Sequence, residues 1–126
     1  MAASLVLDTN VLIYHLNGEQ KVVQQLTQWR EEQVFLLIST IVEIELLSLP
    51  SLSTRDIEVI DELLATLHVV EVDSVLSRAA ASVRRKRRLK LADSIVAATA
   101  LAHGGRLITR NTHDFIKIPE LTVAKI

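Results

Sequence analysis

The residues best suited to chemistry are carboxylates that lie just past a short apolar run or near the start of an apolar helix. They are Asp8, the pair Glu43 and Glu45, Asp93 and Asp114. Three or four carboxylates crowded together repel one another and need compensation. A hard divalent cation supplies it, and the absence of Cys and of a His-rich motif favours oxygen ligation of Mg²⁺ or Mn²⁺ over zinc. Such a site suits phosphoryl chemistry, because Mg²⁺ usually keeps waters and binds substrate phosphates.

Each acid also has a purely structural interpretation when it is taken alone. Asp8 would cap a turn, Asp93 would be the N-cap of a helix, and Asp114 would be a polar loop residue. Glu43 and Glu45 are separated by roughly 200° on a helix, so we expect one to face the site and the other to face solvent. The functional hypothesis therefore depends on whether the fold brings the acids together.

The stretch from Leu5 to Ile13 is the element that would organise such a site. Residues 5–7 are wholly apolar, as in a central parallel strand that is buried on both faces. Asp8 follows, and Thr9 or Asn10 would cap a helix that starts near Val11. The sequence thus puts a carboxylate at the carboxyl end of a central strand, the edge at which open α/β sheets bind ligands.

The remaining chain alternates between helical and strand patterns. We expect helices over residues 19–30, 41–47, 55–68, 73–88 and 91–102, and strands over residues 34–38, 69–72, 106–109 and 121–126. The helices 41–47 and 91–102 are apolar nearly all round, so we expect both to be buried. The alternation predicts an α/β protein with a central parallel sheet between two layers of helices.

Length and composition are those of one domain, which we expect to span residues 1–126. The chain is 49% hydrophobic but only 3% aromatic, so its core must consist of aliphatic side chains. No apolar run is long enough for a bilayer span, and no signal-peptide pattern precedes one. The lack of Cys excludes disulfides and thiolate metal sites. We therefore expect a cytoplasmic protein.

The net charge of −1 conceals two halves of opposite sign. Residues 1–75 hold twelve acids and three bases, whereas residues 76–126 hold three acids and eleven bases. Six of those bases lie between Arg84 and Lys90. The cluster could be a solvated helix face, a contact to a phosphate backbone, or a docking surface for an acidic partner.

Four motifs, spaced over nearly the whole chain, resemble those of PIN domains and in particular of VapC-type toxin ribonucleases from toxin–antitoxin pairs. They cover Leu7–Ile13, Ser39–Leu47, Leu91–Ala100 and Leu107–Phe115, in the family's order. Any one motif is weak, but the four together are fairly specific. The resemblance implies a three-layer α/β/α PIN-like fold and a Mg²⁺-dependent endoribonuclease, in which Mn²⁺ can substitute.

The resemblance also implies roles for individual residues. Asp8, Glu45, Asp93 and Asp114 match the family's acidic metal-binding and catalytic quartet, and Thr9, Asn10, Thr109 and Asn111 match its polar support. The family's spacing after Ser39 selects Glu45 over Glu43. The implied partners are single-stranded or loop RNA, a cognate antitoxin protein and a second subunit. The apolar stripes in residues 22–29 and 57–67 are candidates for the homodimer contact.

The basic cluster then acquires two competing interpretations. We predict that Arg84, Arg85 and Arg88 hold the RNA backbone beside the acidic site, because an anionic substrate needs positive charge there. The alternative is that the same face docks an acidic tail of the antitoxin.

Two other functions remain open at the level of sequence. One is a PIN-like nuclease outside toxin systems, acting in RNA processing or on DNA. The other is a non-enzymatic Mg²⁺-binding α/β module, such as a receiver-like phosphoacceptor. A receiver would need a Lys at a late strand end, where this chain has Thr109-Arg110-Asn111.

Overall fold

Five parallel strands form the centre of the protein. The computed structural model describes residues 4–126, so residues 1–3 of the predicted domain lie outside the described part. The strands are β1 (Ser4–Leu7), β2 (Phe35–Ser39), β3 (His68–Val70), β4 (Arg106–Ile108) and β5 (Thr122–Ala124), and the sheet has the order β3-β2-β1-β4-β5. Every neighbouring pair is parallel. The first strand of the chain is therefore the middle strand of the sheet.

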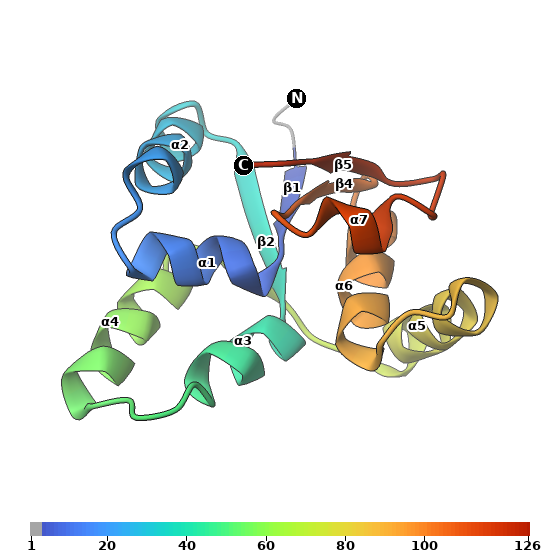
Figure 1. Ribbon diagram of the computed structural model, residues 1–126, viewed down its shortest axis with the longest axis horizontal. Coiled ribbons are helices and arrows are strands. Elements are labelled where there is room, and N and C mark those ends of the chain that lie inside the picture. The colour runs from blue at the N-terminus through green and yellow to red at the C-terminus, as the bar shows by residue number, and fades with distance from the viewer. Residues whose placement is uncertain (1–3) are drawn as a thin grey trace.

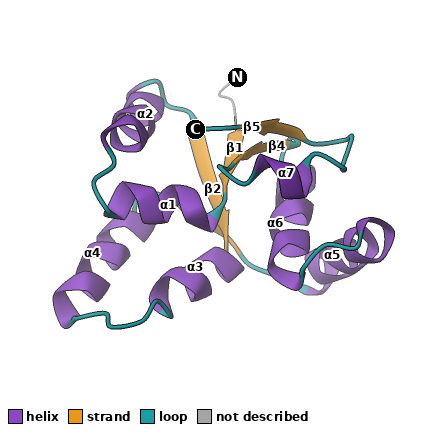
Figure 2. Cartoon of the chain, in the orientation of Figure 1, coloured by secondary structure: helices purple, strands orange, loops and turns teal. Residues whose placement is uncertain are grey.

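Helices cover both faces of this sheet. They are α1 (Thr9–Leu16), α2 (Gln20–Glu31), α3 (Thr40–Leu47), α4 (Thr54–Leu64), α5 (Ser74–Arg87), α6 (Leu91–Ala102) and α7 (Thr112–Phe115). Figure 1 shows α1 and α2 on one side of the strands and α5 and α6 on the other, and Figure 2 separates the helical layers from the sheet by colour. This arrangement confirms the predicted three-layer α/β/α fold. Across residues 4–126, no helix is both long enough and apolar enough to cross a membrane.

The apolar run of β1 explains its central place. Leu5, Val6 and Leu7 are all buried, and Val6 pairs with Leu37 of β2 on one side and Leu107 of β4 on the other. A strand with neighbours on both edges and helices on both faces must be apolar throughout. The strand therefore delivers the next residue, Asp8, to the middle of the sheet's carboxyl edge.

Side-chain caps set the start of most helices, but α6 is an exception. Asp8 accepts a hydrogen bond from Thr9 N at the start of α1, Ser39 caps α3, and Asp73 caps α5. The N-cap of α6 is Lys90, which makes no side-chain capping bond. The N-cap role considered for Asp93 is therefore wrong, because Asp93 lies inside the first turn.

The structure differs from the prediction most clearly at the end of α4 and around Asp114. The helix expected over residues 55–68 ends at Leu64, because the chain turns and His68 already pairs with Leu37 of β2. Leu67 fits the helical period, yet it reaches the core from the turn. Asp114, expected on a loop, lies in the short helix α7.

The expected burial of α3 and α6 is wrong at one side of each helix. Ile44 of α3 is 60% exposed, and Leu91 at the start of α6 is 59% exposed, although residues 96–100 of α6 are buried. The stripes proposed as subunit contacts are in part buried within the protein, since Val22, Leu26 and Ile60 belong to its own core. Ile57 of the second stripe is 41% exposed, so a subunit contact at these stripes stays a prediction.

Candidate active site

Asp8 lies at the junction of β1 and α1 and is held by several hydrogen bonds. The residue is only 7% exposed. One carboxylate oxygen accepts from Thr9 N at 2.8 Å, and the other accepts from the Thr109 hydroxyl at 2.9 Å and from Asn10 Nδ2 at 3.4 Å. The main chain is tied as well, because Asp8 N donates to Ile108 O at 3.0 Å. Position and orientation of this carboxylate are therefore fixed by the ends of two adjacent strands.

Thr109, which directly follows β4, is the centre of this network. Its side chain is fully buried, and its hydroxyl donates to Asp8 while accepting from Asn10 Nδ2 at 3.1 Å and from Asn111 N at 3.0 Å. Asn10 in turn accepts from Arg110 N at 3.2 Å. Three of the residues predicted as polar support, Asn10, Thr109 and Asn111, thus lock the segments after β1 and β4 together.

Thr9, the fourth predicted support residue, connects α1 with α3. Its hydroxyl donates to Glu45 Oε1 at 2.6 Å. Glu45 lies in the second turn of α3, which follows β2, the strand next to β1. The structure therefore places Glu45, the glutamate that the resemblance selects over Glu43, beside the residue that follows Asp8.

Asp93 and Asp114 approach from the other side of the site. Both are half-buried, Asp93 in the first turn of α6 and Asp114 in α7, where it accepts a hydrogen bond from Asn111 Nδ2. Burial raises the pKa of Asp93, and the negative charges of Asp8 and Asp114 raise it further. Two helices that are distant from α1 in the sequence thus complete one acidic edge.

The pKa of Asp8 shows the same crowding. Burial raises the pKa of its carboxyl, hydrogen bonds from Thr109 and Thr9 offset part of that increase, and the charges of Glu45 and Asp114 add to it. The negative charges of Glu45 and Asp114 therefore act on both Asp8 and Asp93. Keeping them ionised together requires positive charge.

The donor chemistry of this site fits a hard divalent cation. All four candidate ligands are carboxylates, which suit Mg²⁺ or Mn²⁺. They do not form a closed cage, because residues 4–126 contain no group of three or more His, Cys, Asp or Glu side chains close enough to hold a metal. An open set agrees with the habit of Mg²⁺ to use one or two carboxylates and to fill its other positions with water and phosphate.

Arg110 is a structural residue of the site that sequence reasoning missed. Its guanidinium pairs with Glu19, lies 4.1 Å from the ring centre of Tyr14, and donates through Nε to Ile126 O at 3.0 Å. These contacts join the α1–α2 connection and the last residue to the segment after β4. Its position directly after Thr109 could have marked Arg110 as part of the site. The sequence alone, however, does not show that Arg110 pairs with Glu19.

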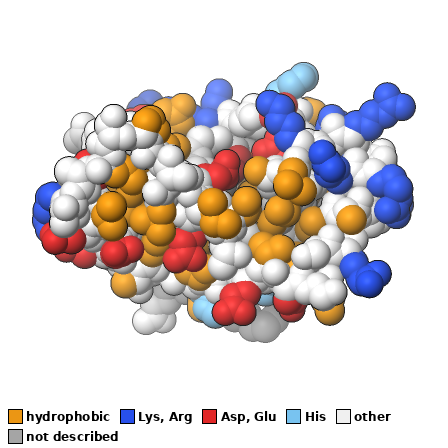
Figure 3. Space-filling model, turned by 90° about the horizontal axis from the view of Figure 1, so that it is seen from below, with side chains coloured by type: hydrophobic (Ala, Val, Ile, Leu, Met, Phe, Trp, Pro, Cys, Tyr) orange, Lys and Arg blue, Asp and Glu red, His pale blue; other side chains and the backbone are white. Residues whose placement is uncertain are grey.

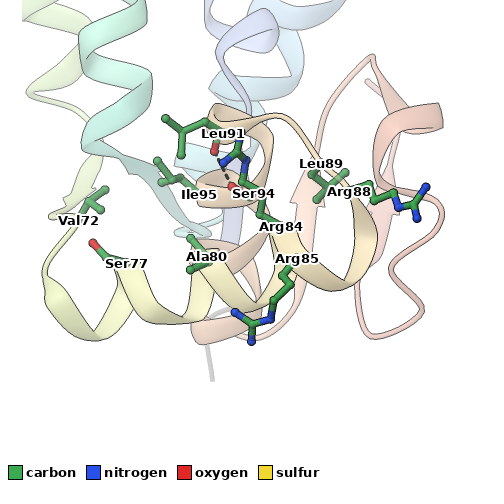
Figure 4. A pocket seen from close by; sticks show the side chains of 11 residues that line it. Val72, Ser77, Ala80, Arg84, Arg85, Arg88, Leu89, Leu91, Ser94 and Ile95 are labelled. Atoms are coloured by element: carbon green, nitrogen blue, oxygen red, sulfur yellow. Dashed lines mark hydrogen bonds between the residues drawn. The ribbon is translucent and has the colours of Figure 1, made fainter.

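The basic cluster divides between two sides of α5. Arg84, Arg85 and Arg88 line a pocket of about 530 Å³ between α5 and α6, whose wall also includes Leu91 and Ile95. Figure 4 shows these side chains around the pocket. Other members point elsewhere, and Arg87 pairs with Glu120 at 3.8 Å. The three arginines predicted to bind RNA therefore share one face, and this face is partly apolar.

The fold and the site define the class of protein. The chain belongs to the PIN-domain family, because the family model described as "PIN domain" matches residues 5–121. The prediction of a PIN domain is thereby confirmed. No curated protein matches the sequence.

Solved structures of the same fold cover nearly the whole chain. VapBC2 from Rickettsia felis, bound to a DNA fragment from its promoter, has a TM-score of 0.83 at 20% identity and covers 98% of both chains. A toxin–antitoxin complex from Klebsiella pneumoniae has a TM-score of 0.80 at 29% identity and covers 97% of this chain and 99% of that one. VapBC-1 from nontypeable Haemophilus influenzae has a TM-score of 0.77 at 24% identity, with 97% of each chain covered. The predicted resemblance to VapC-type PIN proteins is confirmed by these VapBC structures.

Proposed function

We propose that this protein is a Mg²⁺-dependent endoribonuclease, in which Mn²⁺ can substitute, and the toxin of a type II toxin–antitoxin pair. The observation that carries the proposal is the acidic edge, where a buried, hydrogen-bonded Asp8 and the half-buried Asp93 both have raised pKa values. Membership of the PIN family supports nuclease activity, because PIN domains are nucleases. Four interacting carboxylates that need a cation suit hydrolysis of a phosphodiester better than passive binding.

In this proposal the metal would be held at Asp8, Glu45, Asp93 and Asp114, by one or two of these carboxylates directly and by the others through its waters. When bound, a divalent ion lowers the pKa of a coordinated water and stabilises the negative charge that develops on the phosphoryl oxygens. Asp8 serves as the fixed ligand, because Thr109 and Thr9 N already orient both of its oxygens. Thr9 orients Glu45 in the same way. Asn111 positions the Asp114 carboxylate on α7.

Asp93 is the best candidate to accept the proton of the attacking water. Both oxygens of Asp8 already accept hydrogen bonds, whereas Asp93 has a raised pKa and no hydrogen bond to its side chain from the described part of the chain. A carboxylate with a raised pKa is a stronger base than an ordinary one. We therefore assign the proton to an Oδ atom of Asp93.

The structures that this chain resembles support one of the predicted partners, an antitoxin protein. Their printed names describe VapBC and other toxin–antitoxin complexes, which supports a cognate antitoxin for this chain. We further propose that residues 1–126 form one PIN domain that acts in the cytoplasm as a homodimer. A contact of Arg84, Arg85 and Arg88 with RNA stays a prediction.

The decisive experiment is cleavage of a mixed RNA pool and a matched DNA pool, with Mg²⁺, with Mn²⁺ and with a chelator. Wild type should cut RNA only when metal is present, and Asp8→Asn should not cut. Glu43→Gln is a matched control, because it removes a charge from α3 without touching the Thr9–Glu45 bond. Cleavage of DNA instead would assign the alternative PIN nuclease role. Metal binding without cleavage of either pool would assign a binding module.

A further inference from the structure

Arg110 contacts helix α1 at two levels, one helical turn apart. Its backbone N–H donates to Asn10 Oδ1 at 3.2 Å, and its guanidinium carbon lies 4.1 Å from the centre of the Tyr14 ring. Asn10 and Tyr14 are four residues apart in α1, so their side chains lie on one face of that helix. A single residue just past β4 thus contacts two successive turns of α1.

Glu19 holds the other side of the guanidinium. Its Oε2 accepts a hydrogen bond from Arg110 Nη1 at 3.0 Å, and its Oε1 accepts one from Nη2. Glu19 N also donates to Tyr14 O at 3.0 Å, so the residues on both sides of the guanidinium are bonded to each other. Pairing at two points, combined with stacking on an aromatic ring, fixes the plane of a guanidinium. Arg110 is therefore fixed both at its backbone and at the end of its side chain.

This use of Glu19 adds little to the stability of the protein. Glu19 is the N-cap of α2, yet its carboxylate caps no backbone N–H of residues 4–126, whereas Ser39, Ser53 and Asp73 cap their helices with their side chains. The side chains of Arg110 and Glu19 are 26% and 33% exposed, and a partly exposed ion pair contributes little stability. The contact therefore orients Arg110 more than it stabilises the fold.

The fixed backbone of Arg110 determines which way the Asn10 amide points. An amide side chain has one acceptor oxygen and one donor nitrogen. Because Arg110 N–H holds the oxygen of Asn10, the nitrogen must face the acidic site, where it lies 3.1 Å from Thr109 Oγ1 and 3.4 Å from Asp8 Oδ2. The bond to Asp8 is near the upper limit of length, so a small displacement of Asn10 would break it.

We infer that Arg110 is a positioning residue of the acidic site. Glu19 and Tyr14 hold its side chain, and its backbone N–H holds the Asn10 amide. The Asn10 amide in turn helps to orient Asp8. The last step, from Asp8 to a metal ion, rests on the proposed function, whereas the steps from Glu19 to Asp8 do not.

A direct contact of Arg110 with RNA fits the structure less well. Its charge is already paired with Glu19, so a phosphate would have to displace a carboxylate that is bound at two points. Other bases are better placed for RNA, since the ion pairs within residues 4–126 include none of Arg84, Arg85 and Arg88. On the face of the molecule in Figure 3, most of the visible Lys and Arg side chains gather toward one end. Arg110 therefore acts within the protein.

The first test uses the metal-free protein and observes Asn10 directly by NMR. Glu19→Gln and Arg110→Lys should each shift the side-chain amide signals of Asn10 and speed their hydrogen exchange at least about threefold. The matched control is Glu120→Gln, which removes the same charge from a glutamate that pairs with Arg87 in another element. This control should leave both properties of Asn10 as in wild type.

The second test is Mn²⁺ affinity by calorimetry. Glu19→Gln and Arg110→Lys should each weaken Mn²⁺ binding about tenfold, as expected for residues behind a metal ligand. The melting temperature should fall by less than about 5 °C. In an Asn10→Ala background Glu19→Gln should cause no further loss of affinity, because the residue through which it acts is gone. A general structural role would give the same tenfold loss in both backgrounds.

Three results would overturn the inference. They are unchanged Asn10 signals in Glu19→Gln, an equal change in Glu120→Gln, and an undiminished effect of Glu19→Gln in the Asn10→Ala background. If Arg110→Lys leaves Asn10 unchanged but weakens RNA binding, the arginine belongs to RNA instead. If wild type binds no Mn²⁺, the proposed metal site fails, while the NMR comparison still decides the role of Arg110.

Discussion

The two sides of the acidic site are built in contrasting ways. Asp8 is nearly fully buried, and three donors occupy its oxygens. Asp93 is half-buried and lies in the first turn of a helix that has no side-chain cap. Burial raises the pKa of both groups, but only Asp8 has hydrogen bonds that offset part of the increase. The contrast is between a rigid side, which would fix the position of the proposed cation, and a side with fewer hydrogen bonds, which would adjust to cation and substrate.

The strongest test of this contrast is the response of metal binding and of activity to each acid. Asp8→Ala should abolish Mn²⁺ binding in calorimetry, whereas Asp93→Ala should weaken it. Both Asp8→Asn and Asp93→Asn should lower kcat/KM on RNA by about a thousandfold, or roughly 4 kcal/mol of barrier. Equal Mn²⁺ affinity in wild type and Asp8→Ala would exclude Asp8 from the site.

A second test removes the hydroxyl that makes the Asp8 side rigid. Thr109→Val leaves donors on Asn10 and Asn111 and an acceptor on Asp8 without their partner. We expect a loss of about 1–3 kcal/mol in the free energy of unfolding and a 10–100-fold loss of activity. Thr109→Ser keeps the hydroxyl and should lose far less. Equal losses in chemical denaturation for both variants would show that the methyl group matters instead of the network.

A third test concerns the cost of crowding in the metal-free protein. Because the pKa of Asp93 is raised by folding, its ionisation destabilises the fold, and stability falls as the pH rises from the ordinary value of 3.8. Asp93→Asn should therefore raise the melting temperature near neutral pH by about 1–3 °C and flatten this part of the pH profile. Saturating Mn²⁺ should reverse the order, because only the wild-type carboxylate gains a ligand bond.

Asp8→Asn sharpens the same comparison. Its new amide nitrogen would face either Thr9 N, which is itself a donor, or the Thr109 hydroxyl, which already accepts two hydrogen bonds. We therefore expect a smaller gain than for Asp93→Asn, or a net loss. A larger gain for Asp8→Asn in the same melting experiment would contradict a rigid, satisfied Asp8.

The smallest effect is expected at the outer edge of the site. Asn111→Ala removes the hydrogen bond that positions the carboxylate of Asp114 on α7. The Asp114 side chain can then reorient. We predict a two- to fivefold loss of activity, roughly 0.4–1 kcal/mol. His113→Ala, at the exposed neighbour of Asp114, is the control and should match wild type. A loss as large as for Thr109→Val would place Asp114 on the rigid side.

Elements with a strong local signal could be predicted from the sequence. The apolar run before Asp8 has one physical solution, a strand covered on both sides, and the helix over residues 91–102 was predicted with the bounds that it has. The edge at which the acids gather followed from strand alternation alone. The preference for Glu45 came from the resemblance, and the bond to Thr9 adds a structural reason for it.

Features that depend on distant contacts could not be predicted. Nothing local indicates that the Thr109 hydroxyl meets Asp8, or that Arg110 meets Glu19. The burial of Leu91 was misjudged because an apolar side chain has the same local pattern whether it faces the core or a partner. The end of α4 was misjudged because pairing of His68 in the sheet overrides the helical period.

The bond between Asp8 and Thr109 joins residues 101 positions apart and so has a consequence for synthesis. During translation β1 emerges well before its neighbour β4 and the α7 carboxylate. An incomplete chain has Asp8 and Glu45 but lacks the groups that orient and complete them. The acidic site can therefore assemble only after β4 and α7 have been synthesised, whichever part of the chain folds first.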